Sequence, residues 1–595
     1  MIFKISSLTP ALFHGKAVIK KITRLFNTLK HLQFMQLVFF ILRRKFTAAR
    51  VNYTGTPELR VSVAIGEPLT ANGLYQPDGS FVFLNISKNL SAAINNTDVK
   101  ALASVSVDDT QWCPDDVPRL WRYNLHYFDY LRDPNCSNSA ATALLNSWVA
   151  NNSQGSQPGW EPFTASLRIV NWVFYFLRNP QAATPTLLQS LYTQVLWLEK
   201  NDERHILANH YFENLKAFTF AGVFFAGADA ERWLAKGTKG LREQLLEQTL
   251  ADGGHYERTP QYHALMLENY VDIVNLAAHN PVLFEQQKNS DFVALFKSHS
   301  AAALRFYRGI LFPDGLLPLF NDSAFGIAPS FDALQAYWQR LGGESIESVT
   351  SELIDYKESG LFGYRQGDDM VIIDAGDIGP SYQPGHTHCD MLSFELMFNG
   401  QRVVIDSGVL EYEPGPMRHY VRSTRAHNTV SIDGAEQSEV WGEFRVARRA
   451  KVLSAQINNT VSGCLFVGAY QGFHQAGVGL QHRRELAVET SADQAIAAIT
   501  VTDNIQARKA GTTEHLVESF IHFHPALEVA DEQGVIKLLL DDRAIAEVII
   551  GNSASYHFEQ GYYCPEFGIK RDNTRLVLTQ TARLPCQFLY TIRKI

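Results

Sequence analysis

Two histidines in the segment Pro384–Asp390 form the strongest chemical signal in the sequence, because a single residue separates them. His386 and His388 share a face if the segment is extended, and they converge on one point if it turns. Asp406 and His427 follow in segments that read as strand ends. Neutral imidazole and carboxylate are the natural ligands of Zn²⁺ and similar divalent ions. The spacing therefore suggests a metal site; the alternative is a set of unrelated polar residues at strand ends.

A second polar group begins at Asn209, where the sequence reads NHYFEN at the start of an expected helix. His210 and Glu213 lie three residues apart, so they share one face of that helix. A glutamate in this place could orient the imidazole and fix its tautomer. The plainer alternative is a capped helix that carries an ordinary cluster of surface polar residues.

A third group lies in the segment Asp252–His263, which has paired glycines followed by a polar and aromatic run. Pro260 suits the first turn of a helix, and Tyr262 would project from that turn. Tyrosine acts as a general acid or base when nearby cations or hydrogen bonds lower its pKa. The alternative is that Tyr256 and Tyr262 simply pack on neighbouring helices.

Asparagine and arginine side chains near these segments could bind an anionic ligand. Asn321 and Asp322 could line a cleft, although turn formation is the favoured interpretation. Arginine binds carboxylates and sulfates in a bidentate manner, but most arginines only solvate a surface. The arginines within or beside the segments are Arg119, Arg122, Arg168, Arg258, Arg418, Arg422 and Arg425. The expected substrate contacts are Arg122, Arg258, Asn321 and Arg422.

The sequence also excludes several common catalytic loops. It contains no GxSxG elbow, no Walker A loop and no GxGxxG followed by a helix. These patterns position a serine nucleophile or cradle phosphate groups. Their absence lowers the expectation of a hydrolase, an NTPase or a dehydrogenase.

The elements that must position these side chains change character near residue 350. Before that point, apolar residues recur at a spacing of three and four, which predicts helices. The expected helices cover residues 121–131, 140–150, 164–178, 185–200, 209–226, 230–249, 260–279, 290–309 and 331–341. Short links separate them, so the helices are expected to run antiparallel in a bundle or a closed toroid.

After residue 350 the apolar spacing falls to two, which predicts strands. The expected strands cover 370–374, 392–398, 403–406, 428–433, 494–501 and 576–579, with turns between them. Strands without intervening helices form antiparallel sheets. The predicted fold is therefore α+β and multidomain: residues 1–110 hold a basic helix and a small irregular or β segment, 111–345 an (α/α) helical toroid, and 346–595 an antiparallel β-sandwich.

Composition bounds the function further. The 595 residues are 46% hydrophobic and 19% charged, which predicts a folded chain of two or three domains. Lys and Arg number 53 against 61 for Asp and Glu, and the net charge of −8 gives no sign of nucleic-acid binding. Six cysteines without a CxxC pair are too few for a disulfide framework.

The first fifty residues carry ten Lys and Arg, and the first acidic residue is Glu58. The apolar run Leu32–Leu42 is too short to span a bilayer as a helix, and no cleavage site of small residues follows it. A basic amphipathic helix packed on the body is favoured, with a membrane-surface helix or an unusual export signal as alternatives. No transmembrane segment is expected, and a cytoplasmic location is favoured over a periplasmic or secreted one.

Taken in order, eight segments resemble the heparinase II/III-like polysaccharide lyases, a superfamily that also includes related alginate lyases. They are LWRYNLHYFDYL (120–131), GWEPFTASLRIVNW (159–172), ANHYFENLKAFTFAG (208–222), DGGHYERTPQYHALMLE (252–268), PLFNDS (318–323), GHTHCDMLSFEL (385–396), VVIDSG (403–408) and RSTRAHNTVSID (422–433). The resemblance covers residues 110 to 450. It implies the same fold, a helical toroid followed by β-sandwich layers.

The resemblance also implies roles for individual residues. Asn209, His210, Tyr262 and His386 match the catalytic residues, Glu213 matches a supporting acid, and Tyr412 or Tyr420 would fill the place of a further tyrosine. His388, Asp406 and His427 match the ligands of one divalent ion, commonly zinc, with Mn²⁺ or Ca²⁺ as alternatives.

The implied activity is β-elimination in an anionic, 4-linked uronate polysaccharide, with glycosaminoglycans such as hyaluronan, chondroitin or heparan sulfate favoured. The alternatives are an alginate lyase, a lyase for a bacterial capsule or exopolysaccharide, and a non-catalytic polysaccharide-binding relative. Release of a 4,5-unsaturated product would separate the lyases from the binding protein.

Overall fold

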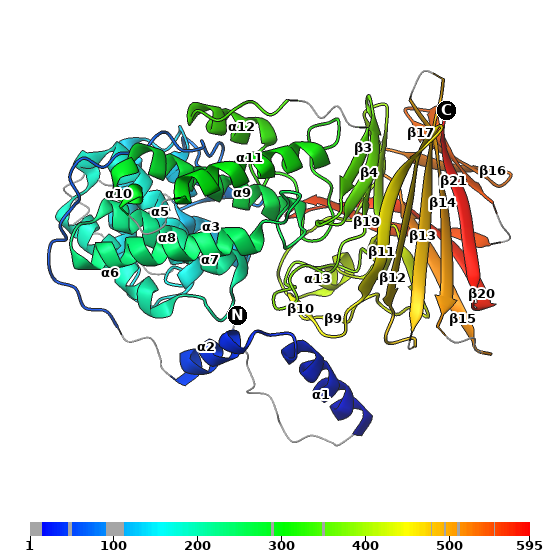
Figure 1. Cartoon of the computed structure of the whole chain (residues 1–595), viewed down its shortest axis with the longest axis horizontal. Coiled ribbons are helices and arrows are strands. Elements are labelled where there is room, and N and C mark those ends of the chain that lie inside the picture. The colour runs from blue at the N-terminus through cyan, green and yellow to red at the C-terminus, as the bar shows by residue number, and fades with distance from the viewer. Residues whose placement is uncertain are drawn as a thin grey trace.

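The computed structural model describes residues 15–45, 50–90, 112–286, 291–347, 352–477, 479–492, 495–508, 512–551 and 554–595. Figure 1 shows a helical part joined side by side to a part made of sheets, with two N-terminal helices below them. The functional residues expected from the sequence all lie in the described ranges.

The helical part contains ten α-helices among the residues that the structure describes. They are α3 (Arg119–Tyr127), α4 (Asn138–Asn151), α5 (Pro162–Arg178), α6 (Pro185–Asn201), α7 (Ala208–Phe224), α8 (Ala228–Gln248), α9 (Pro260–His279), α10 (Pro281–Glu285), α11 (Phe292–Ile310) and α12 (Phe331–Arg340). Proline opens α5, α6 and α9, where its missing N–H costs no helical hydrogen bond.

Helix α7 lies inside the helical part, and nearly all of its residues are buried. It is apolar on most of its circumference, as expected of a helix enclosed by others. It packs on α5 and α8. A β-carbon at Gly222 would lie 2.5 Å from the Leu234 nitrogen, so α7 and α8 approach each other more closely than larger residues would allow. This packing holds the start of α7, which carries Asn209 and His210.

The sheet part consists of three larger antiparallel sheets. The first contains β3 (Leu353–Tyr356), β4 (Leu361–Gln366), β5 (Asp369–Asp374), β6 (Phe394–Phe398) and β7 (Gln401–Val404), in chain order. The second has the order β11 (Lys451–Thr460), β12 (Gly463–Gly472), β13 (Leu480–Thr490), β14 (Ile496–Ala507), β21 (Cys586–Lys594), β18 (Arg543–Ile550), β17 (Val535–Leu540) and β16 (Glu528–Glu532). The third has the order β19 (Ser555–Glu566), β20 (Ile569–Arg583), β15 (Glu514–His522) and β8 (Val430–Ile432).

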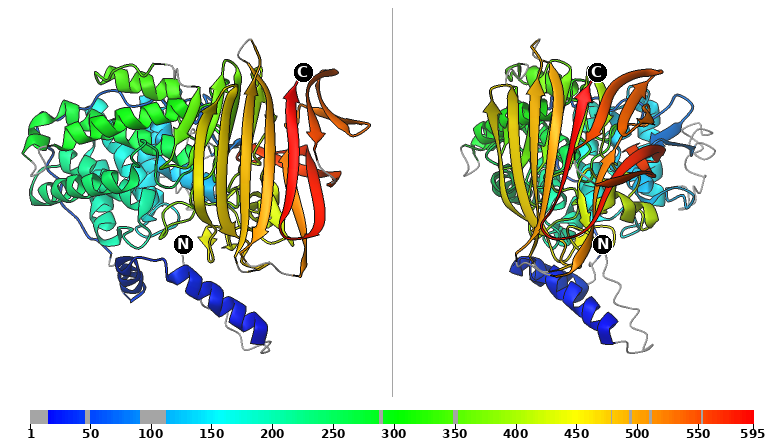
Figure 2. Two further views of the ribbon diagram at one scale, coloured as in Figure 1. Left: turned by 45° about the vertical axis from the view of Figure 1, so that its right-hand side comes forward. Right: turned by 90° about the vertical axis from the view of Figure 1, so that its right-hand side faces the viewer.

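The sheets are layered, as Figure 2 shows, and one apolar core runs between them. Residues from all three sheets meet there, including Phe394, Phe466, Ile499 and Leu578, each with almost no exposed surface. Strand β12 alternates buried and half-buried positions along its length, the pattern of a strand with one face on the core. The loop between β5 and β6 leaves this core and reaches the helical part.

Residues 50–90 pack on the helical part. They contain the hairpin of β1 (Ser80–Phe83) and β2 (Ile86–Asn89), in which Phe81 contacts Tyr130 and Phe83 contacts Trp121 edge to face. Upstream lie α1 (Gly15–Leu29) and α2 (Phe34–Lys45), so the expected single basic helix is two helices. No single described helix is long and apolar enough to cross a membrane, although the bent pair Lys21–Leu29 and Phe34–Leu42 meets that test together.

The expected fold class is confirmed: a helical region precedes antiparallel sheets. Most expected helices agree with the structure within two residues at each end, and 260–279 agrees at both ends. The proposed division at residues 345–346 falls between α12 and β3, whereas the one at 110–111 lies outside the described residues. Strands β3, β4, β11–β13, β15–β19 and β21 were not among those expected from the sequence.

Candidate functional site

Two rings from distant parts of the chain stack where the helical and sheet parts meet. Tyr262 lies in the first turn of α9, and His386 lies in the loop between β5 and β6. Their centroids are 3.8 Å apart and their planes differ by 29°. Tyr262 is half-buried, and 14% of the His386 side chain is exposed. Two of the residues that the sequence singled out are therefore in contact, at a place that is partly open to solvent.

Asp322 fixes the orientation of both histidines in the loop. It lies between α11 and α12, fully buried, and its oxygens are 3.0 Å from Nδ1 of His386 and 2.8 Å from Nε2 of His388. Arg418, in α13 (Pro416–Val421), donates to both of its oxygens. Burial alone would raise the pKa of Asp322, but the charge of Arg418 and these hydrogen bonds hold it well below its usual range.

A charged carboxylate only accepts hydrogen bonds, so each nitrogen that faces Asp322 carries a proton. His386 is therefore protonated on Nδ1 and His388 on Nε2. In the neutral imidazoles, the lone pairs then lie on the opposite nitrogens, Nε2 of His386 and Nδ1 of His388. The two residues thus present different nitrogens to their surroundings, although only Thr387 separates them.

Glu257 connects the start of α7 to His386. It lies in the loop between α8 and α9, where Oε1 accepts from the Asn209 backbone N–H at 3.4 Å, and Oε2 lies 3.4 Å from Nε2 of His386. Burial raises the pKa of Glu257, while His386, the Asn209 N–H and His210 act in the opposite direction. Asn209, Glu257, His386 and Tyr262 thus form one continuous group, drawn from two helices and two loops.

The backbone that leads into α7 is strained. Leu207 has φ 66° and Ala208 has φ 52°, values that side chains with a β-carbon rarely adopt. Such a residue costs about 1–2 kcal/mol. The buried packing of α7 must offset this cost. Asn209 and His210 therefore follow directly after a sharp turn of the backbone.

His210 lies beside a carboxylate that precedes its helix. Its Nδ1 is 3.1 Å from Oε1 of Glu203, and its ring lies on Phe163 with centroids 4.4 Å apart. Asn214 holds Glu203 in turn: its side-chain oxygen accepts from the Glu203 N–H and its amide donates to Oε2. One third of the His210 side chain is exposed.

Glu213 does not take the orienting place expected from its spacing. Its Oε1 accepts from Asn269 at 2.5 Å, and its Oε2 is buried without a hydrogen-bond partner among the described residues. Burial raises the pKa of Glu213 to about 7, despite the nearby charge of Lys216. Positions 210 and 213 share a face of α7, but the Glu213 carboxylate turns toward Asn269 of α9 and away from His210.

Of the two further tyrosines, Tyr412 contacts the site. Its hydroxyl lies 3.4 Å from that of Tyr262, and the Arg418 guanidinium lies 4.9 Å from its ring centroid. The Tyr420 hydroxyl instead accepts from the Tyr562 backbone N–H at 3.3 Å. Burial raises the pKa of Tyr262 and Tyr412 above the usual value, so both phenols carry their protons at neutral pH.

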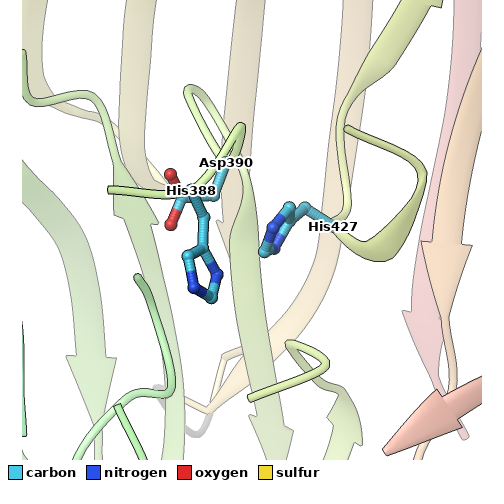
Figure 3. A group of neighbouring side chains, drawn as sticks. All are labelled: His388, Asp390 and His427. Atoms are coloured by element: carbon cyan, nitrogen blue, oxygen red, sulfur yellow. The ribbon is translucent and has the colours of Figure 1, made fainter. Parts of the chain in front are cut away.

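His388, Asp390 and His427 gather ligand atoms within 4.8 Å of one another (Figure 3). All three side chains are buried. Nδ1 of His388 and Nε2 of His427 have no hydrogen-bond partner among the described residues. Burying a polar atom without a partner costs free energy, and two imidazole nitrogens with a carboxylate match the donor preference of a divalent ion. These residues therefore fit a metal.

Asp406 lies behind His427, outside this group. Its Oδ2 is 2.7 Å from Nδ1 of His427, and its Oδ1 accepts from the Gly408 N–H. Burial lowers the pKa of His427, but the charge of Asp406 outweighs it and raises the pKa to about 9. In the described structure, the carboxylate nearest the open nitrogens is therefore that of Asp390, whereas Asp406 orients His427, as carboxylates behind metal-bound histidines do.

The four expected substrate contacts are largely occupied by the protein. Arg258 donates to the carbonyls of Glu358 and Asp377, and Arg422 is buried with three backbone carbonyls as partners. Asn321, also buried, donates from its backbone to Asp390 and accepts from the His388 N–H. Arg122 is partly exposed and lies 3.8 Å from Asp115.

These contacts have a common physical reason. An arginine or asparagine at a junction of loops is surrounded by backbone carbonyls and amides that need partners, and it satisfies them. Arg258, Arg422 and Asn321 thus hold the loops that carry the histidines. Arg122 contacts neither Tyr262 nor His386 in any described hydrogen bond or ion pair.

The sequence analysis missed Glu203 and Glu257 as members of the site. Asp390 stands in the same segment as His386 and His388, and Asp322 follows Asn321, so both were visible as neighbours of expected residues. Arg418 was among the arginines near the segments. Glu257 also stands in a segment that the sequence singled out, next to Arg258, whereas Glu203 lies outside all of these segments and is marked only by its proximity in space.

The sequence agrees with two models of one family. Residues 133–337 match the heparinase II/III N-terminal model, and residues 348–591 match the heparinase II/III-like C-terminal model. The chain is 25% identical over 310 residues to a heparin-sulfate lyase of Pedobacter heparinus, and 25% identical over 306 residues to one of Bacteroides stercoris. Each match covers 46% of this chain, and the chain spans less than half the length of these relatives, 44% and 43%.

Solved structures agree in fold. A heparinase III crystal structure superposes with a TM-score of 0.61 at 16% identity, covering 80% of this chain and 76% of the other. A heparan sulfate lyase from Pedobacter heparinus superposes with a TM-score of 0.56 at 18% identity, covering 82% and 78%. The two family models, which match the helical part and the sheet part in turn, show that this chain belongs to the heparinase II/III-like superfamily.

Proposed function

We propose that this protein is a polysaccharide lyase that cleaves 4-linked uronate chains by β-elimination and leaves a 4,5-unsaturated sugar. The observation that carries the proposal is the stacking of Tyr262 on His386, which joins the helical and sheet parts at a partly exposed place. Asn209 lies in the same group through Glu257. Family membership and the relatives named heparin-sulfate lyases support the same reaction.

The reaction requires removal of the C5 proton, which lies α to a carboxylate and is only weakly acidic. Its loss builds negative charge on the carboxyl oxygens, so hydrogen-bond donors aimed at them lower the barrier. Asn209 suits this role, because no hydrogen bond from the described residues occupies its side-chain amide. Its position at the start of α7 also places it at the positive end of the helix dipole.

Tyr262 suits the transfer of a proton to the departing O4 oxygen. Burial keeps its phenol protonated at neutral pH, and its hydroxyl contacts that of Tyr412, toward which Arg418 brings a positive charge. Such proton transfer is worth about 10²–10⁴-fold in rate. The tautomer set by Asp322 leaves the lone pair of the neutral His386 imidazole on Nε2, the nitrogen that lies 3.4 Å from Oε2 of Glu257.

Substrate stereochemistry then divides the work. In glucuronate the C5 hydrogen and the C4 oxygen lie on one side of the ring, so one residue on that side could take the first proton and donate the second. Tyr262 could do both only after losing its own phenol proton, which its raised pKa opposes. In iduronate or guluronate they lie on opposite faces, and a histidine, His210 or His386, takes the proton while Tyr262 donates one. The His386 imidazole and the Tyr262 phenol stack on one another, and they are the base and acid that the second route requires.

A divalent ion would be held by Nδ1 of His388, Nε2 of His427 and the Asp390 carboxylate. Two imidazoles and one carboxylate favour zinc, with Mn²⁺ or Ca²⁺ as alternatives. When bound, the ion would supply a fixed positive charge that ties together the loops behind His386. His388 and Asp390 lie on the loop of His386, so its geometry depends on them.

Glycosaminoglycans are the proposed substrates. The test is to incubate the purified protein with heparan sulfate, hyaluronan, chondroitin sulfate, alginate and a bacterial capsular uronate polysaccharide. The expected result is ultraviolet-absorbing unsaturated product from at least one glycosaminoglycan, with masses that identify it. Product from alginate or capsule alone would replace glycosaminoglycans with that polysaccharide as the substrate class. Binding without product would favour a non-catalytic relative. The absence of both binding and product would overturn the proposal.

A further inference from the structure

The outward faces of α1 and α2 expose large apolar side chains. On α1 these are Ile22, Leu25 and Phe26, and on α2 they are Phe34, Met35, Ile41 and Leu42. Phe26 is 66% exposed and Phe34 is 76% exposed. The spacings of three, four and seven residues place each set along one side of its helix. A soluble surface rarely leaves so many large apolar residues uncovered within one short segment.

The opposite sides of the same helices are fixed to the body. Arg24 pairs with Glu439 at 3.0 Å, and the Trp441 indole donates to Thr28 at 3.2 Å. On α2 the buried Gln36 donates to the Ile206 carbonyl, and the Arg204 guanidinium lies over Phe39. The two helices therefore have a defined inner side, so their apolar side chains project away from the protein. Figures 1 and 2 draw both helices on one side of the body.

Charge shows what this surface fits. The protein has a net charge of −8, yet its first fifty residues hold ten Lys and Arg and no acidic residue. Lys21 is exposed in the middle of α1, and Lys30 is exposed directly after its last residue. A second copy of the chain would bring like charges together at this surface, which disfavours self-association. An anionic lipid surface offers both the negative charge and the apolar layer that these helices lack.

We propose that α1 and α2 bind the surface of an anionic bilayer, with their apolar faces in the interfacial layer and their basic residues at the headgroups. The helices have 15 and 12 residues and bend by 109° at their junction. A spanning helix needs about 20 apolar residues. The proposed mode is therefore attachment in the plane of the interface, and it is independent of the lyase reaction.

The test is co-sedimentation of the full chain with vesicles of phosphatidylcholine alone or of phosphatidylcholine with phosphatidylglycerol. Binding is expected only with phosphatidylglycerol, and it should weaken as salt rises. The triple variant Ile22→Ser, Phe26→Ser, Ile41→Ser should bind at least about tenfold more weakly. The control is Leu453→Ser, Val461→Ser, which removes exposed apolar residues of the sheet part and should bind normally.

Thermal melting and analytical ultracentrifugation complete the test. Both variants should melt as the unchanged protein does, because the replaced side chains are exposed. Equal binding by the triple variant and the unchanged protein would overturn the proposal, as would absence of binding to phosphatidylglycerol vesicles. A dimer that the triple variant abolishes would show that a second copy covers this surface and would overturn it equally.

Discussion

The helical and sheet parts contribute different kinds of residue to the site. From the helical part come Tyr262 and His210, which are partly exposed, whereas the sheet part buries His388 and His427 completely. Exposed groups can contact a polymer, whereas the two buried nitrogens without hydrogen-bond partners among the described residues fit a metal ion. One surface of the junction is therefore open to a ligand, and the layer behind it is closely packed. Asp322 connects the two.

Replacing Asp322 tests that connection and should have the largest effect. Asp322→Asn leaves Arg418 buried without its ionic partner and frees both imidazoles. Breaking a buried ion pair costs about 3–5 kcal/mol of the free energy of unfolding. The pKa of Asp322 is lower in the folded protein than in the unfolded chain. The stability that its charge contributes is therefore fully present above the unfolded pKa and is lost as the pH falls through the folded pKa. Denaturant unfolding at neutral and at acid pH measures the loss of stability and its change with pH. The free energy of unfolding of the variant should fall less on acidification than that of the unchanged protein.

The matched control is Asp503→Asn. Asp503 is equally buried and accepts from His482 and Arg484, but it lies in the strands of the sheet part. It should lose similar stability while the folded fraction keeps its turnover. Asp322→Asn should lose turnover as well. If the two variants behave alike in activity, the connection between the exposed and buried layers does not exist.

Tyr262→Phe tests the exposed layer alone. Removing the hydroxyl should lower turnover by about 10²–10⁴-fold while polysaccharide binding and the melting temperature stay unchanged. Tyr420→Phe is the control, since its hydroxyl contacts the Tyr562 backbone instead. Turnover by initial rates and binding by titration separate the two. Normal turnover by the Tyr262 variant would remove tyrosine from the reaction.

Metal content tests the buried layer and the division between its two carboxylates. Asp390→Ala removes a proposed ligand atom and should abolish stoichiometric metal, as measured by elemental analysis after dialysis. Asp406→Ala removes only the carboxylate behind His427 and should weaken metal affinity by about 10–100-fold. The reverse order would make Asp406 the ligand, and no metal in the unchanged protein would leave the buried group structural.

The smallest effects are expected from the two glutamates of the helical part, Glu203 and Glu213. Glu203→Gln removes the charge beside His210 and should lower turnover about tenfold, a magnitude typical of orienting carboxylates. Glu213→Gln should leave turnover within about twofold, because its carboxylate faces Asn269 and not His210, and its pKa of about 7 already makes the uncharged form accessible at neutral pH. A larger loss in the Glu213 variant would restore the role expected from its spacing.

Much of this was predictable because local patterns determine it. Pro260 and the apolar spacing after it predict α9 to the residue, and the pattern of His386 and His388 marks the loop that reaches the helical part. The strands β11–β13 escaped prediction although β12 alternates clearly, because mixed polar and small residues in GCLFVGAYQG weaken its apolar signal.

The rest depends on contacts between distant segments. Spacing favoured Glu213 as the partner of His210, but the loop before α7 brings Glu203 closer. Similarly, Asp406 was grouped with the histidines by order in the chain, whereas Asp390 has the better position in space. Helical and strand periods report which residues share a face, and they do not report which loop closes over that face.

Asp322 fixes the proton of His386 on Nδ1 and that of His388 on Nε2, which limits how related chains can change at this position. A substitution at Asp322 would disturb His386 and His388 together, so neither could be retuned by that route without the other. Descendants that keep the buried aspartate inherit both as a unit, and those that lose it must rebuild both.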